Sequence, residues 1–278
     1  MMDLYNQTCF ECSKIITKSY STSFSIGIRA FDKRFRYPIY SIYGFVRYAD
    51  EIVDTFHQHN KHQLIKTFRA HTFEAIEQRI SLNPVLQSFQ EVVNSYGIDK
   101  TLIEAFLNSM EMDIDNTSHD QESYQRYIYG SAEVVGLMCL RVFCETNENL
   151  YQQLRPHARS LGSAFQKVNF LRDIKADLEE RGRTYFPQIN FDNFTELQKQ
   201  EIEADILKDF EDAFKGIKRL PNGTKLGVYI AYIYYLKLFK KISRTPASEI
   251  VQKRIRVSDS HKMVLYLKAV VQQKLKVV

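Results

Sequence analysis

The stretch Asn169–Asp177, which reads NFLRDIKAD, places two aspartates four residues apart in an otherwise largely apolar segment. A second pair, Asp50 and Asp54, occurs in Arg47–Asp54, which reads RYADEIVD. Helical residues four apart lie on one face, one turn apart, so each pair can hold a hard divalent cation from one side. Two facing pairs would form a Mg²⁺ site suited to a diphosphate, because Mg²⁺ binds through one or two carboxylates together with phosphate oxygens.

Polar side chains extend each aspartate pair into a longer stripe at helical spacing. The positions between them are apolar, so both stripes should line a cavity, because buried polar groups need partners. A structural salt-bridge network is the alternative. Asp205 and Asp209 share the four-residue spacing, but lysines and other acids surround them, which predicts a solvated helix face. The first stripe comprises Tyr43, Arg47, Asp50 and Asp54, and the second comprises Gln166, Asn169, Asp173 and Asp177.

The spacing of apolar residues predicts an all-α fold. Among 278 residues there are only 10 glycines and 6 prolines, and apolar residues recur mostly at intervals of three and four. Asn83, Gly97 and Asp99 are predicted to cap helices, while Pro38 should kink its helix or mark its start. No linker or composition break divides the chain, so residues 1–278 are predicted to form a single domain. The predicted helices span residues 4–19, 33–57, 61–79, 84–96, 100–114, 121–144, 148–178, 195–215, 224–243 and 248–275.

Charge and cysteine content narrow the class of protein. The net charge of +5 and pI near 8.8 suit an anionic ligand or a negatively charged membrane surface, and equally a solvated excess of lysine. The longest uncharged aromatic run, Gly227–Leu236, is too short to span a membrane, and the start lacks the layout of a signal peptide. Four cysteines fit a reducing compartment, and Cys9 and Cys12 lack the second half of a zinc site. We therefore expect a soluble, cytoplasmic protein.

Aromatic residues suggest what such a cavity would hold. The chain has 19 Phe and 17 Tyr, many of them on the same predicted helices as the polar stripes. Aromatic faces attract cations without reacting as an amine or a carboxylate would, although most of these rings should fill the core. Tyr43, Tyr129 and Tyr185 each lie beside a charged or glycine-bearing segment. The small residues of Tyr127–Gly136 would thin a helix wall, which costs stability and indicates a packing or functional reason.

These motifs together resemble the phytoene/squalene synthase family of head-to-head prenyl transferases. Asn169–Asp177, continued by RGRTYFP at 181–187, is similar to the second family signature, Tyr43–Asp54 to the first, and Ser21–Phe24 to the phosphate-contacting segment. The resemblance implies a single-domain, all-α helical bundle of the isoprenoid synthase type. Its central hydrophobic cavity would have both aspartate motifs at the mouth. The implied reaction condenses two allylic prenyl diphosphates with Mg²⁺, or with Mn²⁺ as an alternative metal.

The resemblance also implies roles for individual residues. Ala132 and Val135 are expected to line the cavity, since both are small residues of the glycine-bearing segment. Glu133 stands where the family commonly has a glycine, and Thr245–Ser248 lacks a tyrosine that relatives often place there, so both bear on the chain length accepted. The implied roles are metal binding for Asp50, Asp54, Asp173 and Asp177, diphosphate binding or positioning for Ser21, Ser23, Arg47, Gln166, Asn169 and Arg172, and contact with the reacting ends for Tyr43, Tyr129 and Tyr185.

The expected product is phytoene, formed from two geranylgeranyl diphosphates without NADPH. Leu137 and Met138 after Gly136 resemble the bacterial phytoene synthases, and no hydrophobic tail precedes the end at Val278. Squalene or dehydrosqualene synthase acting on two farnesyl diphosphates is the alternative. A head-to-tail synthase usually has a denser aspartate motif, and a helical assembly factor would have a broken pair, whereas both pairs are intact. No nucleic-acid partner is expected, and peripheral association with the inner face of the membrane is compatible with the charge.

Overall fold

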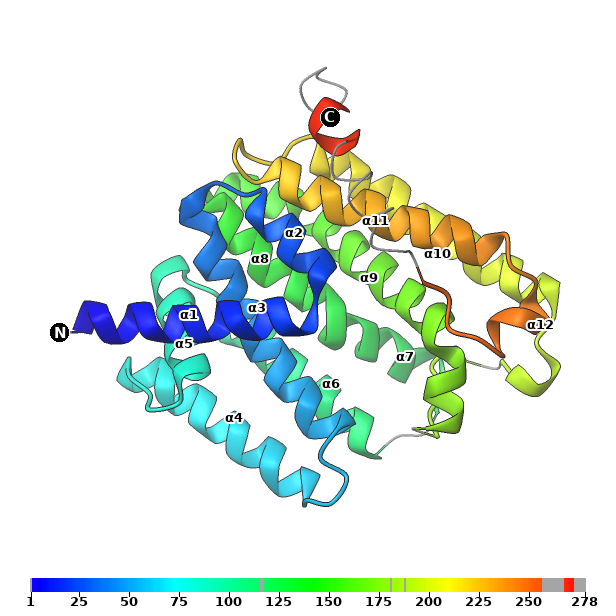
Figure 1. Ribbon diagram of the computed structural model, residues 1–278, viewed down its shortest axis with the longest axis horizontal. Helices are drawn as coiled ribbons and strands as arrows, with labels where there is room; N and C mark the ends of the chain where they lie inside the picture. Colours follow the sequence, from blue (N-terminus) through cyan, green and yellow to red (C-terminus); the bar gives the residue numbers. More distant parts are fainter. Residues whose placement is uncertain (1, 116–117, 181, 188, 257–267, 273–278) are drawn as a thin grey trace.

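The computed structural model of the protein describes residues 2–115, 118–180, 182–187, 189–256 and 268–272. Every regular element in this part of the chain is a helix, which confirms the predicted all-α fold (Figure 1). The elements are α1 (Met2–Tyr20), α2 (Thr22–Arg29), α3 (Lys33–Asp54), α4 (Lys61–Gln78), α5 (Pro84–Tyr96), α6 (Lys100–Asp115), α7 (Gln121–Ile128), the π-helical η1 (Tyr129–Glu133), α8 (Val134–Cys144), α9 (Glu148–Glu179), the 3₁₀ turn η2 (Phe191–Asn193), α10 (Glu196–Ile217), α11 (Lys225–Ser243) and α12 (Ala247–Ile250).

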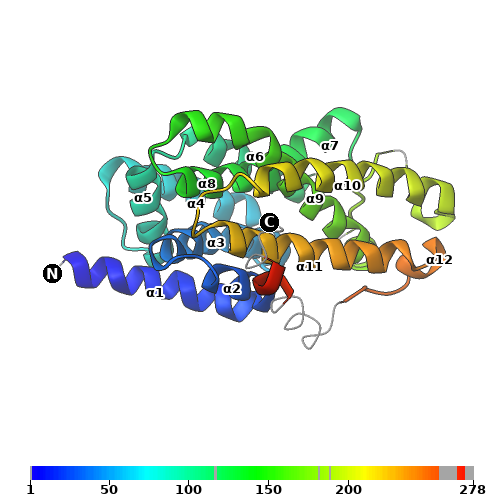
Figure 2. The same cartoon turned by 90° about the horizontal axis from the view of Figure 1, so that it is seen from above.

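The two helices that carry the aspartate pairs are α3 and α9, and α8 packs against both. The long helix α9 crosses the middle of the molecule and also packs against α10 and α11. Figure 2 shows α1, α2 and α11 along one side of the molecule and α6, α8 and α10 along the other. This arrangement leaves α9 and α3 in the interior, where both stripes of polar residues have neighbouring helices to face.

Most predicted helix boundaries agree with the structure. The Asn83 side chain accepts hydrogen bonds from the first backbone N–H groups of α5, and Gly97 ends that helix in the left-handed region at φ 63°. Asp99 accepts from the Thr101 backbone N–H at 2.9 Å at the start of α6. Pro38 lies inside α3, which begins at Lys33, so Pro38 does not mark the start of the helix.

Three stretches differ from the prediction. Helix α2 was not predicted; the Ser21 side chain caps it by accepting from the Phe24 backbone N–H at 3.2 Å. The helix predicted over residues 121–144 contains the π-helical turn η1. The helix predicted over residues 248–275 is wrong at residues 251–256, which are not helical, because α12 ends at Ile250. Residues 257–267 and 273–275 of that prediction lie outside the described residues.

Aromatic packing fixes α3 in place. Phe45 is fully buried and stacks on Phe89 of α5, with ring centroids 3.9 Å apart and planes 2° from parallel. Phe45 also stacks on Phe68 of α4 at 5.5 Å. Such buried ring contacts contribute strongly to core stability. Because this face of α3 is held by α4 and α5, the face carrying Tyr43 and Asp50 is directed to the opposite side.

The segment 121–144 passes the length and hydropathy criteria for a membrane-spanning helix, contrary to the expectation that no segment would. More than half of its most apolar window, 56%, is buried inside the protein. Gly130 brings it against α6 so closely that a Cβ atom there would lie 2.4 Å from the Ala105 carbonyl oxygen. These contacts explain its apolar composition as that of a core helix.

Candidate active site

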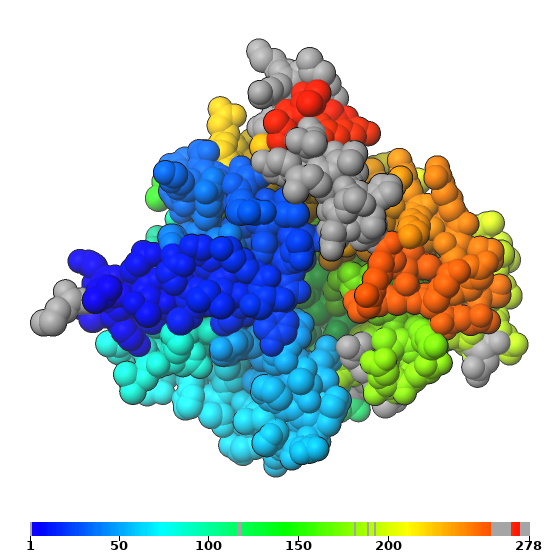
Figure 3. Space-filling view, in the orientation of Figure 1, coloured from blue at the N-terminus to red at the C-terminus, as the bar shows by residue number. Residues whose placement is uncertain are grey.

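A cavity of about 630 Å³ occupies the centre of the molecule, lined by residues of α1, α2, α3, α6, α7, η1, α8, α9, α10 and α11. Figure 3 shows a hollow between the α1–α3 region and the segment around α12, with α9 visible at its base. Along α9 the lining extends from Leu154 to Asp177, a separation of 23 residues that corresponds to about 35 Å of helix axis. The cavity is therefore a deep channel with mostly apolar walls.

All four predicted metal-binding aspartates line this cavity. Asp50 and Asp54 come from the last turns of α3, and Asp173 and Asp177 from the last turns of α9. The stripes predicted from helical spacing thus lie on the cavity wall. Carboxylates thus reach the cavity as pairs from two helices. Among the described residues, no group of three or more His, Cys, Asp or Glu side chains converges in a metal-binding arrangement.

Arginines face these carboxylates at the mouth of the cavity. Arg47 Nη1 lies 4.0 Å from Asp50 Oδ2 and its guanidinium also pairs with Glu51. Arg172 Nη2 lies 2.5 Å from Asp173 Oδ2, and Arg254 Nε lies 2.7 Å from Asp173 Oδ1. Each of these guanidinium groups is paired with a carboxylate here, and their planar forks suit the bidentate binding of phosphate oxygens.

Most of the residues predicted to bind or position the diphosphate line the cavity. Ser21, Gln166, Asn169 and Arg172 line it, and Tyr235 donates a hydrogen bond to Asn169 Oδ1 at 3.3 Å. Ser23 is partly buried on α2 and is not among the lining residues. The small side chains Ala132 and Val135 line the wall, as predicted.

Two of the three predicted tyrosines reach the cavity. Tyr43 lines it, and burial raises the pKa of Tyr43 to about 12 against the opposing effect of Arg47. Tyr185 lines it as well, stacked on Phe170 with ring centroids 4.1 Å apart. Buried phenols with raised pKa values stay neutral and can donate hydrogen bonds at neutral pH.

Tyr129 is the exception, and Tyr127 lines the cavity instead. The Tyr129 ring lies under the guanidinium of Arg159, 5.2 Å from its centroid. Residues two apart on a helix point about 200° away from each other, so Tyr127 and Tyr129 cannot both face the cavity. The prediction that Tyr129 lies near the reacting ends is corrected accordingly.

The cavity wall also contains residues that were not predicted as site residues, among them Asp113, Arg183, Tyr235 and Arg254. Asp113 follows Phe106 and Met110 at helical spacing on α6, and that pattern could have revealed it as an inward-facing carboxyl group. Tyr235 stacks on Phe165 with ring centroids 3.9 Å apart, which joins α11 to α9 in the wall. Arg254 lies beyond the end of α12, where no local sequence pattern predicted its position.

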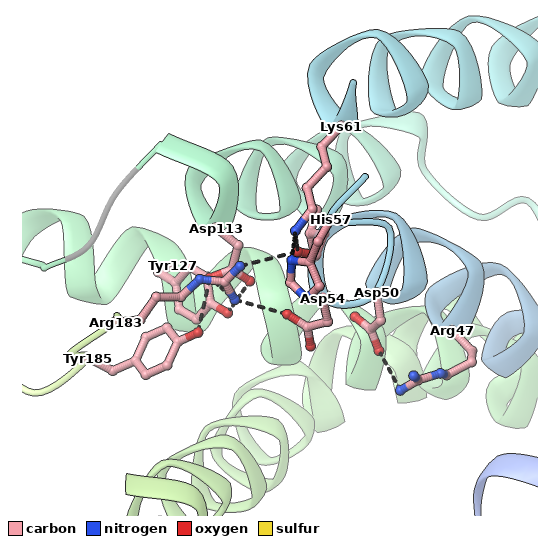
Figure 4. Close-up of polar contacts among 10 residues, drawn as sticks. Arg47, Asp50, Asp54, His57, Lys61, Asp113, Tyr127, Arg183 and Tyr185 are labelled. Carbon is pink, nitrogen blue, oxygen red and sulfur yellow. Dashed lines mark hydrogen bonds and ion pairs between the residues drawn. The ribbon is translucent and has the colours of Figure 1, made fainter. Parts of the chain in front are cut away.

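Asp113 lies in a buried network next to Asp54. Tyr127 and Tyr185 donate hydrogen bonds to its two carboxylate oxygens, at 2.7 Å and 3.1 Å (Figure 4). Arg183 Nη1 lies 3.0 Å from Asp54 Oδ1 and 3.7 Å from Asp113 Oδ1. Burial raises the pKa of Asp113 to about 6, although Arg183 acts in the opposite direction.

The remaining aspartate pair, Asp205 and Asp209, lies off the cavity but is not a simple solvated face. Lys167 of α9, whose side chain is only 9% exposed, lies 2.5 Å from Asp205 Oδ2 and 2.8 Å from Asp209 Oδ2. Glu133 is also off the cavity, because it pairs with Arg159 at 2.5 Å. The interpretation as a solvated face therefore holds for Asp205, whose side chain is 56% exposed, and is wrong for Asp209, which is 20% exposed. Through Lys167 the pair joins α10 to α9.

Comparison with known proteins places the chain among characterised relatives. The squalene/phytoene synthase family model matches residues 17–261. Phytoene synthase 1 of Solanum lycopersicum is 23% identical over 95% of this chain and 68% of its own length. Presqualene diphosphate synthase of Sinorhizobium fredii is 31% identical over 66% of this chain and 65% of its own length.

The fold has counterparts among solved structures. A dehydrosqualene synthase crystallised with a ligand superposes with a TM-score of 0.80 at 20% identity, covering 97% of this chain and 98% of that one. At 20% identity the superposition shows only that the two folds are alike. The family assignment depends on the family model, which matches residues 17–261. The chain belongs to the squalene/phytoene synthase family and is a prenyltransferase of the kind that condenses prenyl diphosphates head to head.

Proposed function

We propose that the protein joins two C20 geranylgeranyl diphosphates to form phytoene, with Mg²⁺ and without a reductant. The depth of the cavity is the observation that carries the choice of C20 over C15. Asp173, at the mouth, and Leu154, the lining residue of α9 farthest from it, both line the cavity. Their separation of 19 positions corresponds to about 28 Å of helix axis.

An extended prenyl chain can be compared with this depth. An extended polypeptide advances roughly 3.5 Å per three backbone bonds, so a four-bond isoprene unit advances about 5 Å. A C15 chain would then reach about 15 Å and a C20 chain about 20 Å. The C20 chain leaves about 8 Å at the mouth for the diphosphate, and the C15 chain, with the same space for its diphosphate, would leave about 5 Å of apolar channel unfilled. An unfilled apolar channel loses packing contacts, so the depth favours C20.

The donor set at the mouth fits the divalent metal that the family uses. Asp50 and Asp54 approach from α3, and Asp173 and Asp177 from α9, which gives carboxylate oxygens from two sides. Oxygen ligands of this kind suit Mg²⁺ and Mn²⁺. When bound, the metal would neutralise charge on the departing diphosphate. We assign Asp50, Asp54, Asp173 and Asp177 to holding it.

The proposed reaction loses both diphosphates and two protons. The C–O bond of the first substrate breaks, and its diphosphate leaves with the electron pair. The resulting allylic cation is attacked by a double bond of the second substrate, and loss of a proton gives a cyclopropylcarbinyl diphosphate. The second diphosphate then leaves, the ring opens with rearrangement, and loss of another proton gives the neutral hydrocarbon. Each cationic stage needs an environment that excludes water and donates no nucleophile.

The residues of this chain supply that environment. Arg47, Arg172 and Arg254 lie at the mouth and can stabilise the negative charge that develops on the leaving diphosphate. Ser21, Gln166 and Asn169 can position its oxygens. The rest of the wall is mostly rings and aliphatic side chains, among them Phe24, Phe165 and Tyr235. Their faces can attract a carbocation without bonding to it.

Product analysis tests this proposal. The protein would be incubated with Mg²⁺ and either C15 or C20 prenyl diphosphate, with and without NADPH, and the extracted hydrocarbon identified by mass. We expect a C40 hydrocarbon from the C20 substrate whether or not NADPH is present. A C30 hydrocarbon as the only product, or a cyclopropylcarbinyl diphosphate that accumulates without further conversion, would overturn it.

A further inference from the structure

The side chain of Asp113 is the most deeply buried acid on the cavity wall, at 6% exposure. It comes from α6, which carries neither aspartate pair. Its oxygens accept from two tyrosine hydroxyl groups, so its position and orientation are fixed from α7 and from the segment after α9. A buried carboxylate with two such donors still needs a cation nearby to be stable when ionised.

Arg183 supplies that cation, but it is shared with the first aspartate pair. Its side chain is 9% exposed, and its guanidinium lies between Asp54 and Asp113 (Figure 4). Nη2 also donates to the Val53 carbonyl oxygen at 3.4 Å, and Lys61 Nζ donates to the same oxygen at 2.7 Å. Two cationic side chains therefore lie at the end of α3, close to an aspartate that we assign to the metal.

A turn at the end of α9 brings Arg183 to this place. Gly182 adopts φ 64°, in the left-handed region, and the Arg183 backbone N–H donates to the Asp177 carbonyl oxygen at 2.8 Å. Arg183 is thus tied by its backbone to the second aspartate pair and by its side chain to the first. A guanidinium and a divalent cation cannot both take the full charge of Asp54, so they compete for it.

We propose that Asp113 is a positioning residue that draws Arg183 partly away from Asp54 and so sets the affinity of the first aspartate pair for a divalent cation. The inference rests on the proposed function, because it takes Asp54 as a metal ligand. If the charge of Asp113 is removed, Arg183 keeps Asp54 as its carboxylate partner, since a buried guanidinium is strongly destabilised without one. The cation must then displace a more firmly held arginine.

Mn²⁺ binding to the substrate-free protein, measured by calorimetry, tests the proposal directly. Asp113→Asn should weaken Mn²⁺ binding by about tenfold, within the usual range of coupling between linked sites. Arg183→Gln removes the competitor and should tighten binding, by about threefold or more. Mg²⁺ concentrations for half-maximal activity should shift in the same two directions. If Asp113→Asn does not fold, Arg183→Gln still decides, because unchanged or weaker binding in that variant contradicts the competition.

A double variant separates this mechanism from a simple loss of negative charge near the metal. If Asp113 acts through Arg183, adding Asp113→Asn to Arg183→Gln should leave Mn²⁺ affinity almost unchanged. A further loss of affinity as large as that in Asp113→Asn alone would show a direct field effect and overturn the proposal.

Asp209→Asn is a matched control for Asp113→Asn. Burial raises the pKa of Asp209 as well, and this carboxylate also pairs with a buried cation, but it does not line the cavity. The Asp209→Asn variant should have the same Mn²⁺ affinity as the wild type. A loss of affinity as large as that in Asp113→Asn would also contradict the inference. A wild-type protein that binds no Mn²⁺ and makes no hydrocarbon would instead overturn the proposed function.

Discussion

Gly162 of α9 touches the π-helical turn at Ala132: a Cβ atom on Gly162 would lie 2.6 Å from the Ala132 carbonyl oxygen. The missing side chain lets the two backbones meet, while the methyl group of Ala132 lines the cavity. Gly162 precedes Asp173 by 11 residues, or about 16 Å of helix axis. The contact therefore marks a depth close to the length of a C15 chain.

Ala132→Phe should close the channel at this depth and shift the preference from C20 to C15 substrate. We expect the ratio of kcat/KM for C20 to that for C15 to fall by about tenfold or more, because added volume in a packed wall costs most for the longer chain. Val135→Phe should act in the same direction. Tyr129→Trp, which adds bulk to the same turn away from the cavity, should leave the ratio unchanged. If the ratio of kcat/KM for C20 to that for C15 were the same in all three variants, the prenyl chain would not lie beside Ala132 as proposed.

Both aspartate pairs should be needed for activity. Asp54→Ala and Asp173→Ala each remove a carboxylate from the mouth, where neutralising the leaving group dominates the barrier, so kcat/KM should fall by about a hundredfold or more. Asp205→Ala should have little effect on kcat/KM, because Asp205 does not line the cavity and Lys167 still has Asp209 as an ion-pair partner. Steady-state kinetics with added Mg²⁺ would measure this. A comparable loss in Asp205→Ala would contradict the assignment.

Periodicity on single helices predicted much of the site. The stripes on α3 and α9 required only the spacing of residues within one helix, and all eight of their members line the cavity. Caps such as Asn83 and Gly97 are likewise local, since they depend on neighbouring backbone groups. The short helix α2 was missed because Ser21, which caps it, was interpreted only as a phosphate contact.

The parts of the site that the sequence did not predict depend on contacts between residues of different helices. Asp113 and Arg183 are 70 positions apart, and no pattern in one helix indicates that Arg183 pairs with both Asp113 and Asp54. Tyr129 was predicted to face the cavity, but Tyr127 does so instead. The family resemblance does not indicate which way the side chains point in a helix that contains a π-helical turn. Asp209 was misassigned because its partner Lys167 lies on another helix.

The Lys167 cluster should be structural and should affect stability more than activity. Asp209→Ala removes the partner at 2.8 Å and the acceptor of the Ser163 hydroxyl, leaving a buried ammonium with only the more exposed Asp205. We expect the free energy of unfolding to fall by about 3 kcal/mol, against about 1 kcal/mol or less for Asp205→Ala. Urea unfolding of both variants measures the difference. Similar losses in the two variants, or lost activity in folded Asp209→Ala, would contradict this role.

Asp113 should make the free energy of unfolding depend on pH in a distinct way. Its pKa is raised from 3.8 to about 6, so between these values the folded protein binds a proton that the unfolded chain releases. The stabilisation is fully present below the unfolded pKa and is lost as the pH rises through 6, by up to about 3 kcal/mol. Wild type should therefore lose stability relative to Asp113→Asn between about pH 4.5 and pH 7. Urea unfolding across this range checks the sign, and a constant difference would contradict it.

A competition experiment tests the central claim most directly. Equal concentrations of C15 and C20 prenyl diphosphates would be incubated with the protein and Mg²⁺ in the absence of NADPH, and the hydrocarbons separated by mass. The depth of the cavity and the aspartate pairs at its mouth predict a C40 hydrocarbon as the main product. A C30 hydrocarbon as the main product under these conditions would contradict the account.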